Sequence, residues 1–220
     1  MTIKIIYPPR PKGKMPPSDL PYYEGTGKWL AQRKFRGSRA VVHISANREI
    51  TLGNRHGKQF ARFSLDRKCR DEICQSLTLQ KGLEYWLDGE LMNKDENATN
   101  EIIFFDVLQV GRYLFNTPTQ VERLKMLQEI CGNPQNLCRS KIALEITPHI
   151  WLAETFDKDF MLRYNEALPN PQLEGLVLRK KTAGLDNFGD SEYETTNLIR
   201  CRKSFGLDTP KAGRSGGYEF

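Results

Sequence analysis

The feature that most constrains the fold of this sequence is a series of short apolar runs rich in β-branched and aromatic residues. Such runs are typical of β-strands. They cover residues 40–44, 49–52, 84–91, 102–108, 141–146, 175–178 and 198–202. Strands and helices do not alternate strictly, as they would in a parallel doubly wound fold. The sequence therefore predicts an α+β fold with two largely antiparallel β-sheets flanked by helices.

Three segments have the periodicity of helices. Apolar residues recur at helical spacing over 65–73 and over 155–167. Between them, Thr119 and Glu122 form a capping box ahead of an apolar helical face, and Gly132 follows that face. We expect a helix in each segment.

With 220 residues, the chain has the length of one large domain with a sizeable core. Residues 1–28 are rich in proline and predict an extended lead-in without regular structure. We expect the folded domain to cover 29–203 and a flexible tail to cover 204–220. No apolar run has the length of a signal peptide core or a membrane span.

The net charge of +6 favours an anionic partner such as nucleic acid or a nucleotide. The five cysteines are odd in number and contain no Cys-x-x-Cys pair. This pattern favours neither a disulfide framework nor a zinc ribbon. A reducing compartment, the cytoplasm, fits this cysteine content best.

One lysine has a setting that suits covalent chemistry. Lys34 lies in the run Gln-Arg-Lys-Phe-Arg-Gly-Ser-Arg, residues 32–39, just ahead of a glycine turn. A lysine amine attacks phosphorus only where its surroundings disfavour the ammonium form. Arg33, Arg36 and Arg39 would supply positive charge for this purpose. Taken alone, the run also fits a solvated basic turn.

Further segments carry groups that a nucleotide site needs. Glu90 ends an Asp-Gly-Glu sequence and Glu174 begins a strand, and such carboxylates are suitable ligands for magnesium on phosphates. Phe105 offers an aromatic face for a base, and residues 200–203 project alternate cations. Each feature is common by itself, so their order along the chain is the informative part.

In that order the sequence resembles the covalent nucleotidyltransferases, namely ATP-dependent DNA ligases, RNA ligases and mRNA capping enzymes. The segments that carry the resemblance are the lysine and glycine turn, 54–57, 88–90, 105–106, 174–177 and the basic strand 200–203. Residues 105–124 look most like the DNA ligase branch, and the compact, proline-led form is similar to bacteriophage ligases. The implied fold is the ATP-grasp-like nucleotidyltransferase domain of ligases.

The resemblance assigns roles to particular residues. It implies that Lys34 attacks the α-phosphate of ATP and holds AMP through a phosphoramidate bond. Phe105 would stack on adenine, Glu174 would anchor Mg2+, and Glu90 would hold the ribose and assist the metal. The remaining residues that it implies in nucleotide or phosphate binding are Gln32, Arg39, Arg55, Arg179, Arg200 and Arg202.

The sequence departs from the family at several of these places. Arg36 stands where ligases usually have an aspartate, which reverses the charge beside the nucleophile. Gln32 replaces a glutamate that reads the adenine amino group, and its carbonyl oxygen can still accept that hydrogen bond. Arg200 and Arg202 replace paired lysines, which keeps the charge and changes the geometry.

The resemblance predicts an ATP-dependent ligase that seals nicked duplex DNA through lysyl-AMP and transfer of AMP to a 5′-phosphate. RNA ligation and capping-type guanylyl transfer are alternatives, as is a catalytically silent module that binds nicks or nucleotides. We expect a monomer without membrane association, in the host cytoplasm if a phage encodes it. The residues after 203 are too few for the oligonucleotide-binding (OB) barrel that normally follows. The sequence fits a part of a longer ligase, a stand-alone catalytic domain, or a domain that takes the missing function from a partner.

Overall fold

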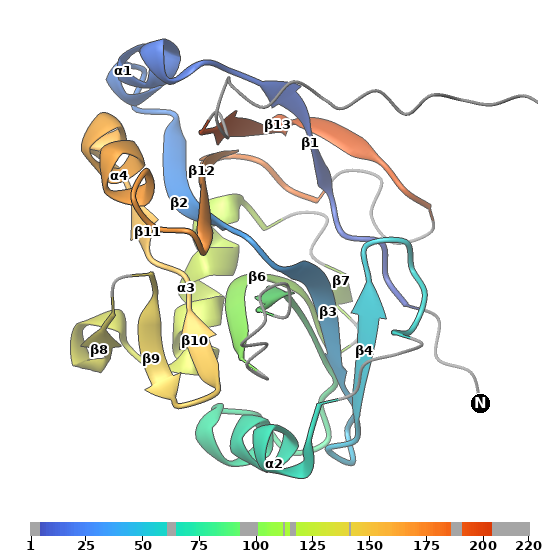
Figure 1. The fold of residues 1–220 in the computed structure, drawn as a ribbon. Coiled ribbons are helices and arrows are strands. Elements are labelled where there is room, and N and C mark those ends of the chain that lie inside the picture. The colour runs from blue at the N-terminus through green and yellow to red at the C-terminus, as the bar shows by residue number, and fades with distance from the viewer. Residues whose placement is uncertain are drawn as a thin grey trace, which may run out of the picture.

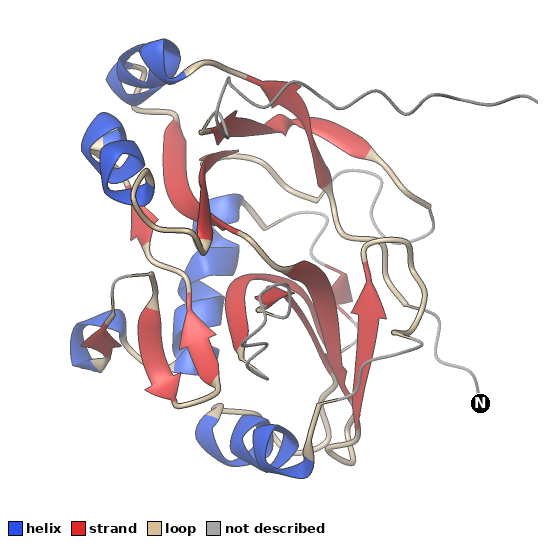
Figure 2. Cartoon of the chain, in the orientation of Figure 1, coloured by secondary structure: helices blue, strands red, loops and turns tan. Residues whose placement is uncertain are grey.

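The computed structural model describes residues 5–60, 65–92, 101–111, 113–114, 118–140, 142–185 and 191–203. This part of the chain forms an α+β fold in which two β-sheets are flanked by helices, as the sequence predicted (Figures 1 and 2). The helices are α1 (Leu20–Gly25), α2 (Arg67–Ser76), α3 (Gln120–Cys131) and α4 (Phe160–Ala167). None of these helices is long and apolar enough to cross a membrane. The predicted tail, 204–220, lies outside the described residues.

The larger sheet has eight strands in the order β4-β3-β5-β6-β10-β9-β8, and β7 pairs with β6. Neighbouring strands are antiparallel except β10 and β6, which are parallel. The strands are β3 (Ser38–Ile44), β4 (Ile50–Asn54), β5 (Tyr85–Leu91), β6 (Ile102–Val110), β7 (Tyr113–Leu114), β8 (Cys138–Arg139), β9 (Leu144–Thr147) and β10 (Ile150–Leu152). Helices α2 and α3 bury Ile73 and Leu127 in the main core against this sheet.

The smaller sheet has five strands in the order β1-β13-β12-β2-β11. They are β1 (Arg10–Lys14), β2 (Trp29–Phe35), β11 (Thr155–Phe156), β12 (Leu173–Lys180) and β13 (Glu194–Arg202). Helices α1 and α4 cover this sheet and pack Leu20 and Phe160 against Leu176 and Leu178. The chain passes directly from β2 into β3, so the residues around Arg36 and Gly37 connect the two sheets (Figure 1).

The capping box at the start of α3 is confirmed. The Thr119 hydroxyl accepts a hydrogen bond from the Glu122 backbone N–H at 3.3 Å, and the Glu122 carboxylate accepts one from the Thr119 N–H at 2.7 Å. Such a cap contributes about 1 kcal/mol of stability. The helix ends before Gly132, whose positive φ of 102° suits a residue without a Cβ.

The prediction of a helix over 155–167 was only partly right. Helix α4 begins at Phe160, because Thr155 and Phe156 pair instead with β2 as an antiparallel strand. The Glu24 carboxylate accepts hydrogen bonds from the Asp159 and Phe160 N–H groups at 2.9 and 2.8 Å. A carboxylate there satisfies unpaired donors and complements the helix dipole, so a distant residue sets the start of α4.

The expectation of a lead-in without regular structure was wrong. Residues 10–14 form β1, which pairs in parallel with β13 at the edge of the smaller sheet. Pro11 is tolerated there because an edge strand leaves one side of its backbone unpaired. Further along, Leu20 in α1 is fully buried. Tertiary pairing and burial, which local composition does not encode, give this segment its structure.

Candidate active site

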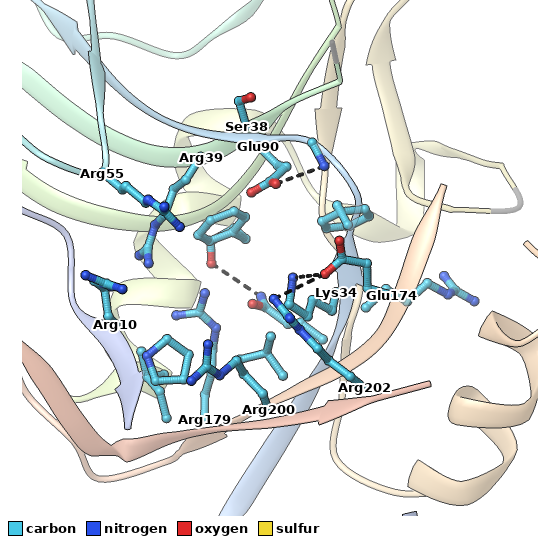
Figure 3. A pocket seen from close by; sticks show the side chains of 18 of the residues that line it. Arg10, Lys34, Ser38, Arg39, Arg55, Glu90, Glu174, Arg179, Arg200 and Arg202 are labelled. Carbon is cyan, nitrogen blue, oxygen red and sulfur yellow. Dashed lines mark hydrogen bonds and ion pairs between the residues drawn. The ribbon is translucent and has the colours of Figure 1, made fainter. Parts of the chain in front are cut away.

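A cavity of about 430 Å³ is lined by residues of both sheets. All of the site residues named from the sequence lie around it. They are Gln32, Lys34, Arg39, Arg55, Glu90, Phe105, Glu174, Arg179, Arg200 and Arg202. Figure 3 shows the labelled members of this set facing the same space from different strands. The structure therefore brings the predicted residues together, and the chemical role of each remains a prediction.

Lys34 lies near the end of β2 and contacts Glu174. The Lys34 Nζ is 2.5 Å from Glu174 Oε2, and both side chains are largely buried (Figure 3). Glu174 lies at a β-bulge, since Phe35 pairs with Leu173 and Lys34 pairs with Gly175 across the β2–β12 ladder. A bulge of this kind redirects the side chain of the extra residue. The carboxylate therefore meets Lys34 although the two residues are not register partners.

Gln32 is buried on the same strand, with a fixed orientation of its amide. Its Nε2 donates to the Phe105 carbonyl at 3.3 Å and to the Thr155 hydroxyl at 2.9 Å. Its Oε1 is buried and has no hydrogen-bond partner among the described residues. A buried acceptor without a partner is costly, so this oxygen is suited to a donor group on a ligand.

Arg39 is held in place by Asp88. The guanidinium makes two hydrogen bonds to the Asp88 carboxylate and a third, at 2.7 Å, to the Pro9 carbonyl. Although burial alone would lower the pKa of Arg39, the neighbouring Asp88 raises it above the ordinary value. Arg39 therefore stays charged, and its guanidinium carbon lies 5.5 Å from the centre of the Phe105 ring.

Arg179 belongs to a buried network behind the cavity. Asp106 accepts hydrogen bonds from Arg179 at 3.0 Å and from Arg123 at 3.0 and 3.3 Å. Gln120 Oε1 accepts from the same two arginines. Burial would raise the pKa of Asp106, but the two guanidiniums hold it below its ordinary value. The network fixes Arg179, whose guanidinium carbon lies 5.1 Å from the centre of the Phe105 ring.

The expectation that Arg33, Arg36 and Arg39 place positive charge around Lys34 needs correction. Because side chains alternate along a strand, Arg33 projects away from Lys34 and pairs with Glu154 at 2.6 Å and Glu166 at 3.1 Å. Arg39 is paired with the buried Asp88, as described above, and Arg36 is not among the described residues that line the cavity. The cations Arg200 and Arg202 on β13, in the same sheet as β2 and separated from it by β12, also line the cavity.

The carboxylates are compatible with a metal that arrives together with phosphates. Among the described residues, no group of three or more His, Cys, Asp or Glu side chains could hold a metal ion by itself. Magnesium in phosphoryl-transfer sites typically takes one or two carboxylates and completes its shell with phosphate and water. Glu174 and Glu90 offer that number, and Glu90 is oriented by a hydrogen bond of 3.0 Å from the Gly37 N–H.

Two titratable residues at the cavity had no role assigned to them from the sequence. Arg10 on β1 and His56 after β4 both line it, and both contact Glu192. Apart from its positive charge, nothing in the sequence of the lead-in indicated that Arg10 would lie at the cavity, because only the pairing of β1 with β13 brings it there.

No protein-family model matches this chain, and no curated protein sequence matches it. Solved structures do match its fold. The ligase domain of LigD from M. tuberculosis superposes with a TM-score of 0.53 at 14% identity, covering 78% of this chain and 52% of that one. A mycobacterial DNA ligase D complexed with ATP and MES gives a TM-score of 0.53 at 14% identity, with 79% and 54% covered.

A third structure, named Pmar-Lig_PreS3, gives a TM-score of 0.54 at 15% identity and covers 86% of this chain and 45% of that one. This chain thus spans about half the length of each of these structures. Identities this low establish a shared fold. The chain has the fold of the nucleotidyltransferase domain of DNA ligases, as the order of its motifs implied.

Proposed function

We propose that this chain is the nucleotidyltransferase part of an ATP-dependent polynucleotide ligase, which seals nicks in duplex DNA through a covalent Lys34–AMP intermediate. The observation that carries this proposal is the convergence of all the residues named from the motif order on one cavity, with Lys34 and Glu174 in contact. The shared fold supports it, since the similar structures include a DNA ligase D complexed with ATP.

The proposed reaction has three steps. The Lys34 Nζ attacks the α-phosphorus of ATP, so that a P–N bond forms while the P–O bond to pyrophosphate breaks. A 5′-phosphate oxygen at the nick then attacks the AMP phosphorus and the P–N bond breaks. Finally the 3′-hydroxyl attacks the 5′-phosphate, a phosphodiester forms and AMP leaves.

The contact between Lys34 and Glu174 bears on the first step. An ammonium must lose a proton before it can attack phosphorus, and Glu174 Oε2 is the acceptor already in contact at 2.5 Å. Arg200 and Arg202 line the same cavity and would stabilise the negative charge that develops on the phosphate oxygens. A magnesium ion held by Glu174 and Glu90 would neutralise further phosphate charge.

The orientation of Gln32 favours adenine over guanine. Because Nε2 donates to two protein oxygens, Oε1 is left as an acceptor for the base. The adenine amino group can donate a hydrogen bond to Gln32 Oε1. Guanine would instead place its carbonyl oxygen, a second acceptor, against this atom. An unsatisfied buried acceptor costs about 1–3 kcal/mol, so we expect roughly a ten- to hundredfold preference for ATP over GTP.

The first experiment incubates the protein with magnesium and ATP labelled on the α-phosphate, followed by denaturing electrophoresis. The variants are Lys34→Ala and, as a matched control, Lys28→Ala, an exposed lysine just ahead of the same strand. We expect label on the wild type and on Lys28→Ala, and none on Lys34→Ala. A parallel reaction with labelled GTP measures the nucleotide preference.

Each result has a distinct meaning. Label that persists on Lys34→Ala would show that another residue is the nucleophile. A protein that binds nicked duplex and takes no label would be a non-catalytic binding module, an outcome that Arg36 beside the nucleophile makes worth testing. Sealing of nicked DNA and nicked RNA substrates by the labelled protein then identifies the polynucleotide.

A further inference from the structure

Strand β1 places one cation of the lead-in at the cavity. Arg10 begins this strand, and its backbone N–H donates to the Tyr193 carbonyl at 3.1 Å just ahead of β13. At the other end of β1, the Met15 N–H donates to the Arg200 carbonyl at 3.0 Å. In Figure 3 the Arg10 side chain faces the same space as Arg200 and Arg179. The position of Arg10 is therefore fixed by backbone pairing over the whole strand.

The cavity has far more positive than negative charge. Eight Lys or Arg residues line it against two glutamates. Three of the arginines, Arg33, Arg39 and Arg179, are matched by buried carboxylates outside the cavity. The remaining arginines are Arg10, Arg55, Arg200 and Arg202. An excess of this kind suits an anionic ligand that brings several charges.

The positive charges of the arginines on β1 and β13 repel one another. Burial lowers the pKa of the Arg200 guanidinium, and the charges of Arg202 and Arg10 lower it further, while Glu194 partly offsets this effect. The Arg200 Nε is also buried without a hydrogen-bond partner among the described residues. A polyanion between these side chains would relieve the repulsion and accept from the unsatisfied donor.

Arg10 is positioned and still able to bind. Its Nη1 lies 2.6 Å from Glu192 Oε2, while the other oxygen of Glu192 lies 2.5 Å from His56 Nδ1. The Arg10 side chain is 31% exposed. A guanidinium has five N–H donors, and Glu192 engages it through a single nitrogen among the described contacts. Glu192 thus orients Arg10 while other donors face the cavity.

We propose that Arg10 is a phosphate-binding residue that completes a cluster with Arg200 and Arg202. The proposal rests on the proposed function, and its ligand is a phosphate oxygen of a substrate. Two sources carry that group, the triphosphate of ATP and the 5′-phosphate of the nick. Strand β1 of the lead-in is then part of the substrate site.

The test compares Arg10→Ala in the full chain with Lys12→Ala as a matched control. Lys12 is exposed on the same strand and does not line the cavity. Equilibrium binding is measured for ATP and adenosine, and for nicked duplexes with a 5′-phosphate or a 5′-hydroxyl. We expect Arg10→Ala to weaken binding of ATP, or of the 5′-phosphate nick, about tenfold, which is the scale of one charged hydrogen bond. Binding of adenosine and of the 5′-hydroxyl nick should stay unchanged.

The ligand that weakens identifies the source of the phosphate. Adenosine and the 5′-hydroxyl nick separate binding from architecture, because neither ligand carries the phosphate. If Arg10→Ala weakened their binding as much as it weakens binding of the phosphate ligands, Arg10 would only support the fold. Unchanged binding of both phosphate ligands by Arg10→Ala would also overturn the proposal. Because binding needs no covalent step, these results stand apart from the Lys34 labelling test.

Discussion

Glu174 contacts two cations through one carboxylate oxygen. Lys34 Nζ lies 2.5 Å from its Oε2, and Arg202 Nη2 lies 3.5 Å from the same atom. The charged form of Glu174 is the one that can accept a proton from Lys34 or hold a metal on phosphate. An amide in this position would keep the size and polarity and lose the negative charge, so the charge is the property to test.

We expect Glu174→Gln to slow the formation of lysyl-AMP by about a hundredfold or more, the scale of a lost acid–base group. The rate of α-phosphate labelling under single-turnover conditions measures this effect. Glu129→Gln on α3 is the control, since Glu129 is an exposed carboxylate outside the cavity. Equal rates for the two variants would remove Glu174 from the chemistry.

The sequence predicted which residues line the cavity better than it predicted the ion pairs that these residues form. Most of the ordered motifs lie on strands that converge, which is why residues as far apart as Gln32 and Arg202 line the same cavity. Sequence adjacency misled the interpretation of Arg33, because alternation along β2 turns it away from Lys34. Arg10 was missed because its place depends on the pairing of β1 with β13, a contact between chain segments about as distant as the domain allows.

At the scale of elements, the bulge in β12 depends on Gly175. Its φ is +120°, and a Cβ built there would lie 2.1 Å from the Cys201 carbonyl oxygen on β13. An alanine would be strained both by its backbone and by this contact. The bulge that aims Glu174 therefore requires glycine at this position.

We expect Gly175→Ala to lower the free energy of unfolding by about 2 kcal/mol or more. Gly25→Ala is the matched control, because Gly25 has open space around its Cα in α1 and should change stability by less than about 1 kcal/mol, in the stabilising direction. Urea unfolding followed by fluorescence measures both. Comparable stabilities of the two variants would mean that β12 accommodates a side chain at the bulge.

Local sequence signals predicted helix α3 well, but they did not predict the start of α4 or the presence of β1. Helix α3 was predicted well because its capping box and terminal glycine are local signals. Helix α4 was predicted too long because its start is set by Glu24 and by the pairing of β11 with β2. Strand β1 was missed for a similar reason, since its partner β13 lies at the opposite end of the described chain.

For the whole molecule, Asp106 joins three layers. It lies on β6 of the larger sheet and binds Arg179 on β12 of the smaller sheet and Arg123 on α3. All three side chains are almost completely buried. Removing one partner of a buried ion pair leaves an uncompensated charge and costs about 3–5 kcal/mol. The stability of the two sheets and of α3 therefore depends on the ionisation of the Asp106 carboxylate.

This coupling predicts a defined dependence of stability on pH. The folded-state pKa of Asp106 lies below its unfolded value of about 3.9, so its stabilising contribution is complete above that pH. The contribution is lost as the pH falls through the folded-state pKa. We expect Asp106→Asn to be about 3–5 kcal/mol less stable than the wild type at pH 7, and the difference to shrink progressively below pH ~4.

Urea unfolding of both proteins from pH 7 down to pH 3 measures that difference. Asp71→Asn on α2 is the control for the loss of one carboxylate, because Asp71 is exposed and its only described ion pair is a surface contact with Arg67. Its stability should follow that of the wild type at every pH. A difference for Asp106→Asn that stays constant into the acid range would show that packing, and not the charge of Asp106, connects the two sheets to α3.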